Sequence, residues 1–226
     1  MWKTGICAAL ASLLVSSVYA DDLQTCSDRQ FSVEAPNDEL LETLCHAAPR
    51  IRDTLSDCGL TQTRPLTIKV VDELSHKIGN CLAWFDCDHD SIRLTNPARY
   101  PEVIDQDSPY ATLPADVLLE NALTHELVHA LITQSANGRE VSLIDHEYIA
   151  AALELELMEP QWRDVLISAA PVSLPPKTGL IDIWIYGLEP RKFATNAWQH
   201  FSLQQNGCGL VERIVQGDET LSRSSR

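Results

Sequence analysis

The segment that most constrains this chain lies near its middle, where two histidines and a glutamate interrupt an apolar helical pattern. The pattern predicts a helix from about residue 114 to residue 134, with Pro114 at its first position. His125 and His129 are four residues apart, so both imidazoles leave the same face of this helix, one turn apart. That spacing lets two ring nitrogens bind one Zn²⁺ at ~2.0–2.1 Å. The sequence therefore predicts a zinc site on this helix.

Glu126 follows the first of the two histidines and points about 100° away around the helix. It cannot easily bind the same ion beside them and lies instead near the fourth coordination position, where a water would sit. A carboxylate there can accept a proton from a metal-activated water and pass it to a leaving amine. We therefore expect Glu126 to be a general base. The alternative is that both histidines are core residues with ordinary hydrogen bonds, because Leu118, Ala122 and Ile132 share their face.

The third metal ligand is expected from three adjacent residues, Asp145, His146 and Glu147. A second helix is predicted from about Asp145 to Met158, where Pro160 ends it. Glu147 lies 18 residues after His129 and begins the strongly helical run, so we prefer it as the ligand. Asp145 and His146 remain alternatives. If they do not bind metal, Asp145 is expected to cap the second helix and His146 to face solvent.

The segment Thr124–Ala130 resembles the active-site helix of the zincin metallopeptidases. The metzincin extension would need Gly at position 132 and His at position 135, where this chain has Ile132 and Ser135. The segment Glu147–Ala151 instead resembles the ligand helix of the gluzincins. The resemblance implies a zinc-dependent peptidase acting on a peptide or protein substrate, with the two histidines and Glu147 as metal ligands. The alternative is a catalytically inactive zincin domain that holds zinc or binds an envelope component.

The same resemblance implies supporting roles. Several gluzincins have an acid four residues after the glutamate ligand, to support the first histidine; here that position is Ala151, and Glu154 is the available substitute. An oxyanion donor is expected from the C-terminal half, with Tyr186 and His200 as candidates and Tyr148 as a third choice.

Substrate is expected along an edge strand before the active helix, for which Ser91–Thr95 is the candidate. The segment from Trp198 to Cys208, with the Glu147 helix, is also similar to an uncharacterised family of exported proteobacterial proteins. That similarity implies no substrate.

The order of predicted elements indicates an α+β fold: a small mixed sheet packed on the active helix, then a mostly helical C-terminal half. The predicted elements are a strand at Gln30–Glu34, a helix capped by Asn37 and ended by Gly59, a buried strand at Leu66–Val71, and a hairpin of Cys81–Phe85 with Ser91–Thr95. We expect one zincin-like domain over residues 21–226, with an α/β part to about 136, a helical part to about 216 and a frayed tail.

Residues 1–20 are predicted to be a secretory signal peptide, because Lys3 precedes an apolar run that ends in Val18-Tyr19-Ala20. The mature chain would be exported, periplasmic or secreted, with no membrane span. Without Lys3 it carries 16 basic and 32 acidic residues, a charge that repels phosphate backbones and makes nucleic acid a poor partner. The sequence indicates no oligomeric state.

Six cysteines remain after the predicted cleavage, an even number that favours disulfides in an exported chain. Cys45 and Cys58 would lie ~20 Å apart on one continuous helix, unless Pro49 breaks it. Cys81 and Cys87 cannot pair if one extended strand joins them. No CxxC pair occurs, which argues against a cysteine zinc site or a thioredoxin-type redox role.

Overall fold

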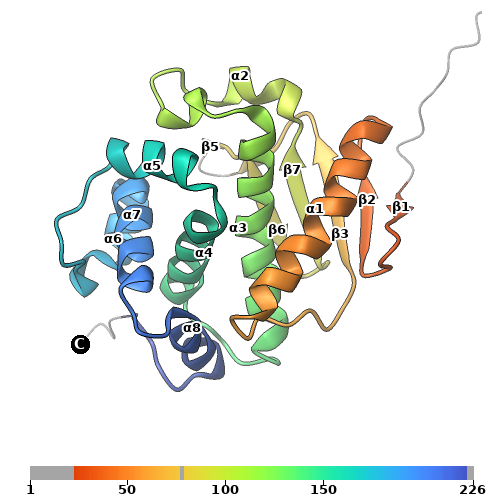
Figure 1. The fold of residues 1–226 in the computed structure, drawn as a ribbon. Helices are drawn as coiled ribbons and strands as arrows, with labels where there is room; N and C mark the ends of the chain where they lie inside the picture. The colour runs from red at the N-terminus through yellow and green to blue at the C-terminus, as the bar shows by residue number, and fades with distance from the viewer. Residues whose placement is uncertain (1–22, 77–78, 223–226) are drawn as a thin grey trace, which may run out of the picture.

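The computed structural model describes residues 23–76 and 79–222, so the predicted signal peptide lies outside the described residues. The N-terminal part of the molecule is a mixed five-stranded sheet with helices on one face (Figure 1). Strands β2, β3 and β7 are parallel, and the short β1 and β6 add antiparallel at the two edges. The strands of this sheet are β1 (Gln24–Thr25), β2 (Phe31–Glu34), β3 (Leu66–Val71), β6 (Ala83–Asp86) and β7 (Ser91–Thr95). A separate antiparallel pair, β4 (Ser75–His76) and β5 (Gly79–Asn80), lies between β3 and β6 in the chain.

Helix α1 (Asp38–Ser56) connects β2 to β3 and covers the sheet. Asn37 caps it as predicted, because its side chain accepts a hydrogen bond from the Leu40 N–H at 2.9 Å. The apolar face of α1 is buried against the inward-facing residues of β2 and β3, which include Phe31 and Ile68. The helix is continuous through Pro49, and after its last turn Gly59 takes the left-handed conformation (φ 75°) that glycine adopts without strain.

Strand β7 is not the edge strand that the sequence suggested. It lies between β3 and β6, so the open edge on this side of the sheet is β6. The hairpin prediction itself is confirmed, with Ala83 paired to Leu94 and Asp86 to Ser91. The error arose because a hairpin pattern does not show which of its two strands joins the sheet; the longer and more buried β7 takes the central position.

Helix α3 (Ala115–Ser135) crosses the sheet beside α1 and contacts β6 and β7 (Figure 1). It begins one residue after Pro114 and ends just before Asn137 and Gly138, both of which have positive φ. Helix α4 (Leu143–Leu157) packs against α3 on one side and α7 on the other. The remaining helical segments are η1 (Pro97–Arg99), α2 (Tyr100–Val103), η2 (Pro109–Thr112), α5 (Pro160–Ala169), η3 (Thr178–Leu180), α6 (Ile183–Leu188), α7 (Pro190–Ser202) and α8 (Gly207–Gln216). The fold is therefore α+β with a mostly helical C-terminal half, as predicted.

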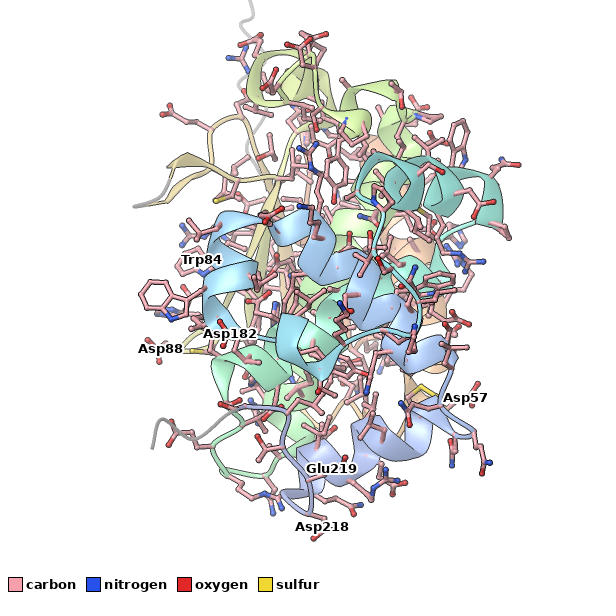
Figure 2. All side chains as sticks on the ribbon, turned by 90° about the vertical axis from the view of Figure 1, so that its left-hand side faces the viewer. Asp57, Trp84, Asp88, Asp182, Asp218 and Glu219 are labelled. Carbon is pink, nitrogen blue, oxygen red and sulfur yellow. A yellow bond between two sulfur atoms is a disulfide. The ribbon has the colours of Figure 1, made fainter. Side chains whose placement is uncertain are left out.

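Two disulfides, Cys26–Cys45 and Cys58–Cys208, use four of the six cysteines discussed above. The second joins the end of α1 to the start of α8, and Figure 2 shows it beside the labelled Asp57. Cys87 is exposed at the tip of the β6–β7 hairpin. None of the helices in the described ranges combines the length and apolar character needed to cross a bilayer. The disulfides are compatible with an exported protein.

The described part of the C-terminal tail, residues 217–222, is hydrogen-bonded to the start of α4. After α8, Gly217 adopts a left-handed conformation and the chain returns to the start of α4. There the Thr220 hydroxyl and the Leu221 N–H both donate hydrogen bonds to Asp145, and the Leu221 side chain packs against the core. Over these described residues the structure differs from the predicted frayed tail, because the buried Asp145 carboxylate binds residues far from it in sequence.

Candidate metal centre

The two histidines predicted on α3 face each other across one helical turn. Their Nε2 atoms are 3.1 Å apart, and the rings meet edge to face with centroids 4.8 Å apart. Helix α3 packs against the sheet, α1 and α4, so much of its surface is buried, and the two imidazoles and Glu126 are polar groups within this element. This arrangement confirms the predicted geometry of the pair.

Glu147 on α4 completes a group of three possible metal ligands with His125 and His129. One ligand atom from each lies within 4.8 Å of the others. Oε2 of Glu147 is 3.6 Å from His125 Nε2, and Oε1 is 3.7 Å from His129 Nε2. A tetrahedral ion with bonds of ~2.0–2.1 Å separates its ligand atoms by roughly 3.3–3.4 Å. The observed separations bracket that value, so two imidazoles and a carboxylate could hold one ion here.

An unpaired buried oxygen supports the same fit. Glu147 Oε2 has no hydrogen-bond partner among the described residues, although it is buried. A buried carboxylate oxygen without a donor is costly, and a cation at the centre of the group would satisfy it. Close approach of the two helices brings Glu147 to the histidines, because the turn after it is formed by the buried Ala150 and Ala151. Larger side chains at these positions would move α4 away from α3.

Glu154, the substitute that the sequence suggested for the missing acid, contacts the first histidine. Its Oε2 is 2.7 Å from His125 Nδ1, and its Oε1 accepts a hydrogen bond from Asn121 Nδ2 at 2.5 Å. Glu154 lies seven residues after Glu147, so the two carboxylates leave the same face of α4 two turns apart. The contact with Glu154 leaves His125 Nε2 directed toward His129, as binding of a shared ion requires.

His146 and Asp145 have different roles from those predicted. Ser142, not Asp145, caps α4, accepting a hydrogen bond from the Asp145 N–H at 3.2 Å. Asp145 is buried and accepts hydrogen bonds from Ser142, Thr220 and the Leu221 N–H. His146 is half-buried rather than solvated, with Nδ1 3.4 Å from His129 Nδ1. The Ser142 cap is local and has a capping signal in the sequence, whereas the contacts with His129, Thr220 and Leu221 depend on distant residues that no local pattern reveals.

Glu126 is buried beside the group and next to the edge strand, where the backbone N–H of Phe85 interacts with its carboxylate. Burial raises the pKa of Glu126 to about 7; His125 opposes the shift and Glu147 adds to it. Burial and Glu126 also raise the pKa of the Cys81 thiol, so Cys81 lies near the same carboxylate. The sequence around Cys81 contains no signal that predicts this proximity.

The charges of the two histidines differ in the absence of metal. Burial lowers the pKa of His125, but the carboxylates of Glu147 and Glu154 outweigh it and hold that pKa well above the ordinary range. Burial and the neighbouring His125 lower the pKa of His129 to about 3, against the opposing effect of Glu147. The carboxylates therefore concentrate positive charge on one histidine while the other stays neutral and able to accept a metal.

The two candidate oxyanion donors lie in different surroundings. Tyr186 on α6 interacts with Glu147, and its pKa is raised by burial and by that carboxylate. His200 on α7 has Nδ1 2.8 Å from the hydroxyl of the buried Tyr148, and its other hydrogen-bond contacts are with Gln204. Among the described contacts, those of His200 and Tyr148 do not include the histidine–glutamate group. The structure therefore brings Tyr186, but not His200, to this group.

Fold and site together define an α+β protein whose His125, His129 and Glu147 could hold a metal ion. The model of a family of unknown function, DUF6639, matches residues 31–224, and the chain belongs to this family. Searches of curated proteins and of solved structures returned no match.

Proposed function

We propose that this protein is a zincin-like, zinc-dependent peptidase of the gluzincin type. The observation that carries the proposal is the group formed by His125, His129 and Glu147, whose ligand atoms lie within 4.8 Å of one another beside the buried Glu126. Two imidazoles and one carboxylate are a ligand set of catalytic zinc, which keeps a fourth position open for water or substrate. Bound zinc would supply Lewis acidity that polarises a peptide carbonyl and makes a water more acidic.

In this proposal, Glu126 is the general base that accepts a proton from water and later donates it to the leaving group. It lies one residue from a ligand histidine but on a different side of α3, and burial raises its pKa to about 7. That value applies to the metal-free protein. A carboxylate at this position, beside the proposed ion, can accept a proton from the attacking water and return it to the leaving amine. The Phe85 N–H helps to fix the carboxylate toward the edge strand, where we expect substrate to lie.

Strand β6, rather than β7, is the proposed binding edge for an extended substrate. The Thr95 N–H donates to the Leu82 carbonyl at 2.8 Å, and hydrogen-bonded pairs alternate along an antiparallel ladder. The backbone of Trp84 therefore bonds inward to β7, whereas the backbone groups of Ala83 and Phe85 point to the edge of the sheet. Of these, the Phe85 N–H interacts with Glu126, so the groups proposed for pairing with a substrate are the N–H and C=O of Ala83 and the C=O of Phe85. A peptide strand could pair there, next to Glu126.

Tyr186 is the proposed donor to the substrate carbonyl oxygen. Its hydroxyl interacts with Glu147, and a tyrosine of ordinary pKa, about 10, is protonated and can donate at neutral pH. Stabilisation of the developing oxyanion by such a donor contributes ~2.7–4 kcal/mol in other hydrolases. The proposal leaves His200 outside the reaction, since its contacts are with Tyr148 and Gln204.

The test combines metal content with proteolysis. Purified mature protein should contain one zinc per chain, and His129→Ala and Glu147→Ala should each lose it. Glu126→Gln should keep the zinc and lose cleavage of an unstructured protein substrate by ~10²–10⁴-fold. Glu120→Gln, an exposed change on the same helix, is the matched control and should retain both.

A wild-type protein without stoichiometric zinc would overturn the metal site. Zinc retained in Glu147→Ala would show that the third ligand is wrong. Stoichiometric zinc without cleavage of any unfolded protein or peptide library would favour a zinc-holding binding protein over a peptidase.

A further inference from the structure

His129 meets a second histidine on the side away from the metal group. Its Nε2 is 3.1 Å from His125 Nε2, whereas its Nδ1 is 3.4 Å from Nδ1 of His146 on α4. The two rings have centroids 5.5 Å apart and planes inclined by only 27°. The rings are thus nearly parallel, and the separation of their Nδ1 atoms allows a long N–H···N hydrogen bond.

The direction of this hydrogen bond follows from the ligand role of His129. An imidazole that binds a metal through Nε2 carries its proton on Nδ1 and needs an acceptor there. The atom in place is His146 Nδ1, which can accept only if His146 carries its own proton on Nε2. Each ring then has one defined tautomer, and the His129 ring cannot rotate without breaking the bond.

We propose that His146 is a positioning residue, which fixes the tautomer and orientation of His129 and so increases the affinity of the site for metal. This inference rests on the proposed metal site. It assigns His146 a role that is neither a ligand nor a solvated side chain. As a ligand, His146 would need a nitrogen directed at the centre of the group, but its Nδ1 faces the nitrogen of His129 that points away from His125.

Helix α4 thus supplies an acceptor to each ligand histidine as well as the third ligand. His146 immediately precedes Glu147, and Glu154 follows it by two turns. Because α4 runs antiparallel to α3, its first turns lie at His129 and its later turns at His125. The two acceptors differ in chemistry: His125 contacts a carboxylate at 2.7 Å, whereas His129 contacts a neutral imidazole at 3.4 Å. The imidazole contact is the weaker of the two.

The experiment uses three substitutions at one position. The side-chain oxygen of Asn occupies about the place of His Nδ1, and that of Gln about the place of His Nε2. His146→Ala and His146→Gln should therefore lower the zinc affinity ~10–100-fold, as loss of such an acceptor does elsewhere, while His146→Asn should remain close to wild type. Zinc affinity is measured on the full mature chain by competition with a chromogenic chelator. The absorption spectrum of the Co²⁺-loaded protein reports whether the ligand set is preserved.

His200→Ala is the matched control, because His200 is also half-buried and also hydrogen-bonded through Nδ1, but to Tyr148. It should leave the zinc affinity and the Co²⁺ spectrum unchanged. The thermal unfolding midpoint of each metal-free variant identifies any loss of folding.

Three results would overturn the inference while leaving the metal site intact. Unchanged zinc affinity in His146→Ala would show that His146 does not act on His129. Equal losses in His146→Asn and His146→Ala would show that an acceptor at Nδ1 is not what matters. A loss as complete as that of His129→Ala, with an altered Co²⁺ spectrum, would make His146 a ligand. Absence of zinc from the wild type would instead overturn the proposed function.

Discussion

The candidate centre takes its residues from two parts of the molecule that differ in how they place them. The N-terminal part, residues 23–136, contributes two histidines and Glu126 from two turns of α3. The C-terminal part, residues 137–222, contributes His146, Glu147 and Glu154 from α4 and Tyr186 from α6. Helical geometry alone brings the first set together, whereas the second set reaches the centre only because α4 packs antiparallel on α3. The positions of the residues in the second set should therefore depend on the contacts between the two parts.

The largest expected effect on that packing comes from the disulfide that joins the two parts. Cys58–Cys208 closes a loop across 150 residues, whereas Cys26–Cys45 spans only 19 within the N-terminal part. In the chain-entropy model, removing the first by a Cys58→Ser and Cys208→Ser double substitution costs about 5 kcal/mol, and removing the second costs about 3 kcal/mol. Urea unfolding of the metal-free proteins measures both. Equal losses would show that loop length does not set the contribution of each disulfide, and no loss on removing Cys58–Cys208 would show that packing alone holds the C-terminal part to α3.

A smaller effect, confined to the N-terminal part, should come from the burial of Glu126. Its pKa in the folded, metal-free protein is about 7, above the ordinary value of 4.5, so the folded state binds more protons than the unfolded state between these pH values. The contribution of Glu126 to stability is then most favourable below pH 4.5 and is lost as the pH rises through 7. At pH 8, Glu126→Gln should stabilise the metal-free protein by up to ~3 kcal/mol, and at pH 4 it should change little.

Unfolding free energies of the wild type and Glu126→Gln at the two pH values, with a chelator present, test this expectation. Glu120→Gln again serves as the control, because Glu120 is half-exposed and paired with Arg50 on the surface. If Glu126→Gln raised the unfolding free energy equally at both pH values, the gain would not come from removing a buried negative charge at pH 8.

The sequence predicts the residues that one element places by its own geometry better than the residues that packing between distant segments brings together. Strands β2 and β3, the β6–β7 hairpin and the His125–Glu126–His129 segment could be predicted, because residue spacing determines which side chains share a face. The two-residue strands β1, β4 and β5 were not predicted. Glu147 and Glu154 could also be predicted, through a resemblance that specified where to look. The hydrogen bonds of Asp145 to Thr220 and Leu221, and the His146–His129 contact, depend on approach between segments that no local pattern encodes. The prediction that β7 is the edge strand was wrong for the same reason, because a hairpin pattern does not show which of its two strands joins the sheet.

Across the interface between the two parts, we expect Glu154→Gln to weaken zinc binding without removing it. Gln keeps an acceptor for His125 Nδ1 but loses the charge that makes the 2.7 Å contact strong. The zinc affinity should fall about tenfold, near the lower end of the range for such supporting residues, which corresponds to about 1.4 kcal/mol. Chelator competition measures the change. Glu156→Gln on the same helix, whose partners are Arg163 and Trp198, should have no effect. An equal loss in both variants would point to the general charge of α4 rather than to the contact.

The smallest effect should come from the C-terminal tail, within the C-terminal part itself. The Thr220 hydroxyl donates to Asp145 Oδ2 at 2.6 Å, and the same oxygen accepts from the Ser142 hydroxyl at 2.7 Å, while the Leu221 N–H bonds to Oδ1. Thr220→Val removes one of these three donors and keeps the shape of the side chain. Because Thr220 is exposed and Asp145 keeps two donors, the free energy of unfolding should fall by only about 1 kcal/mol.

Zinc affinity should not change with it. Asp145 precedes Glu147 by two residues, so it leaves α4 about 200° around the helix, away from the metal group. Thr220→Ser retains the hydroxyl and should restore the stability. If Thr220→Val lowered zinc affinity as well as stability, the tail would help to place Glu147. The position of α4 would then depend on the hydrogen bonds from Thr220 and Leu221 as well as on packing against α3.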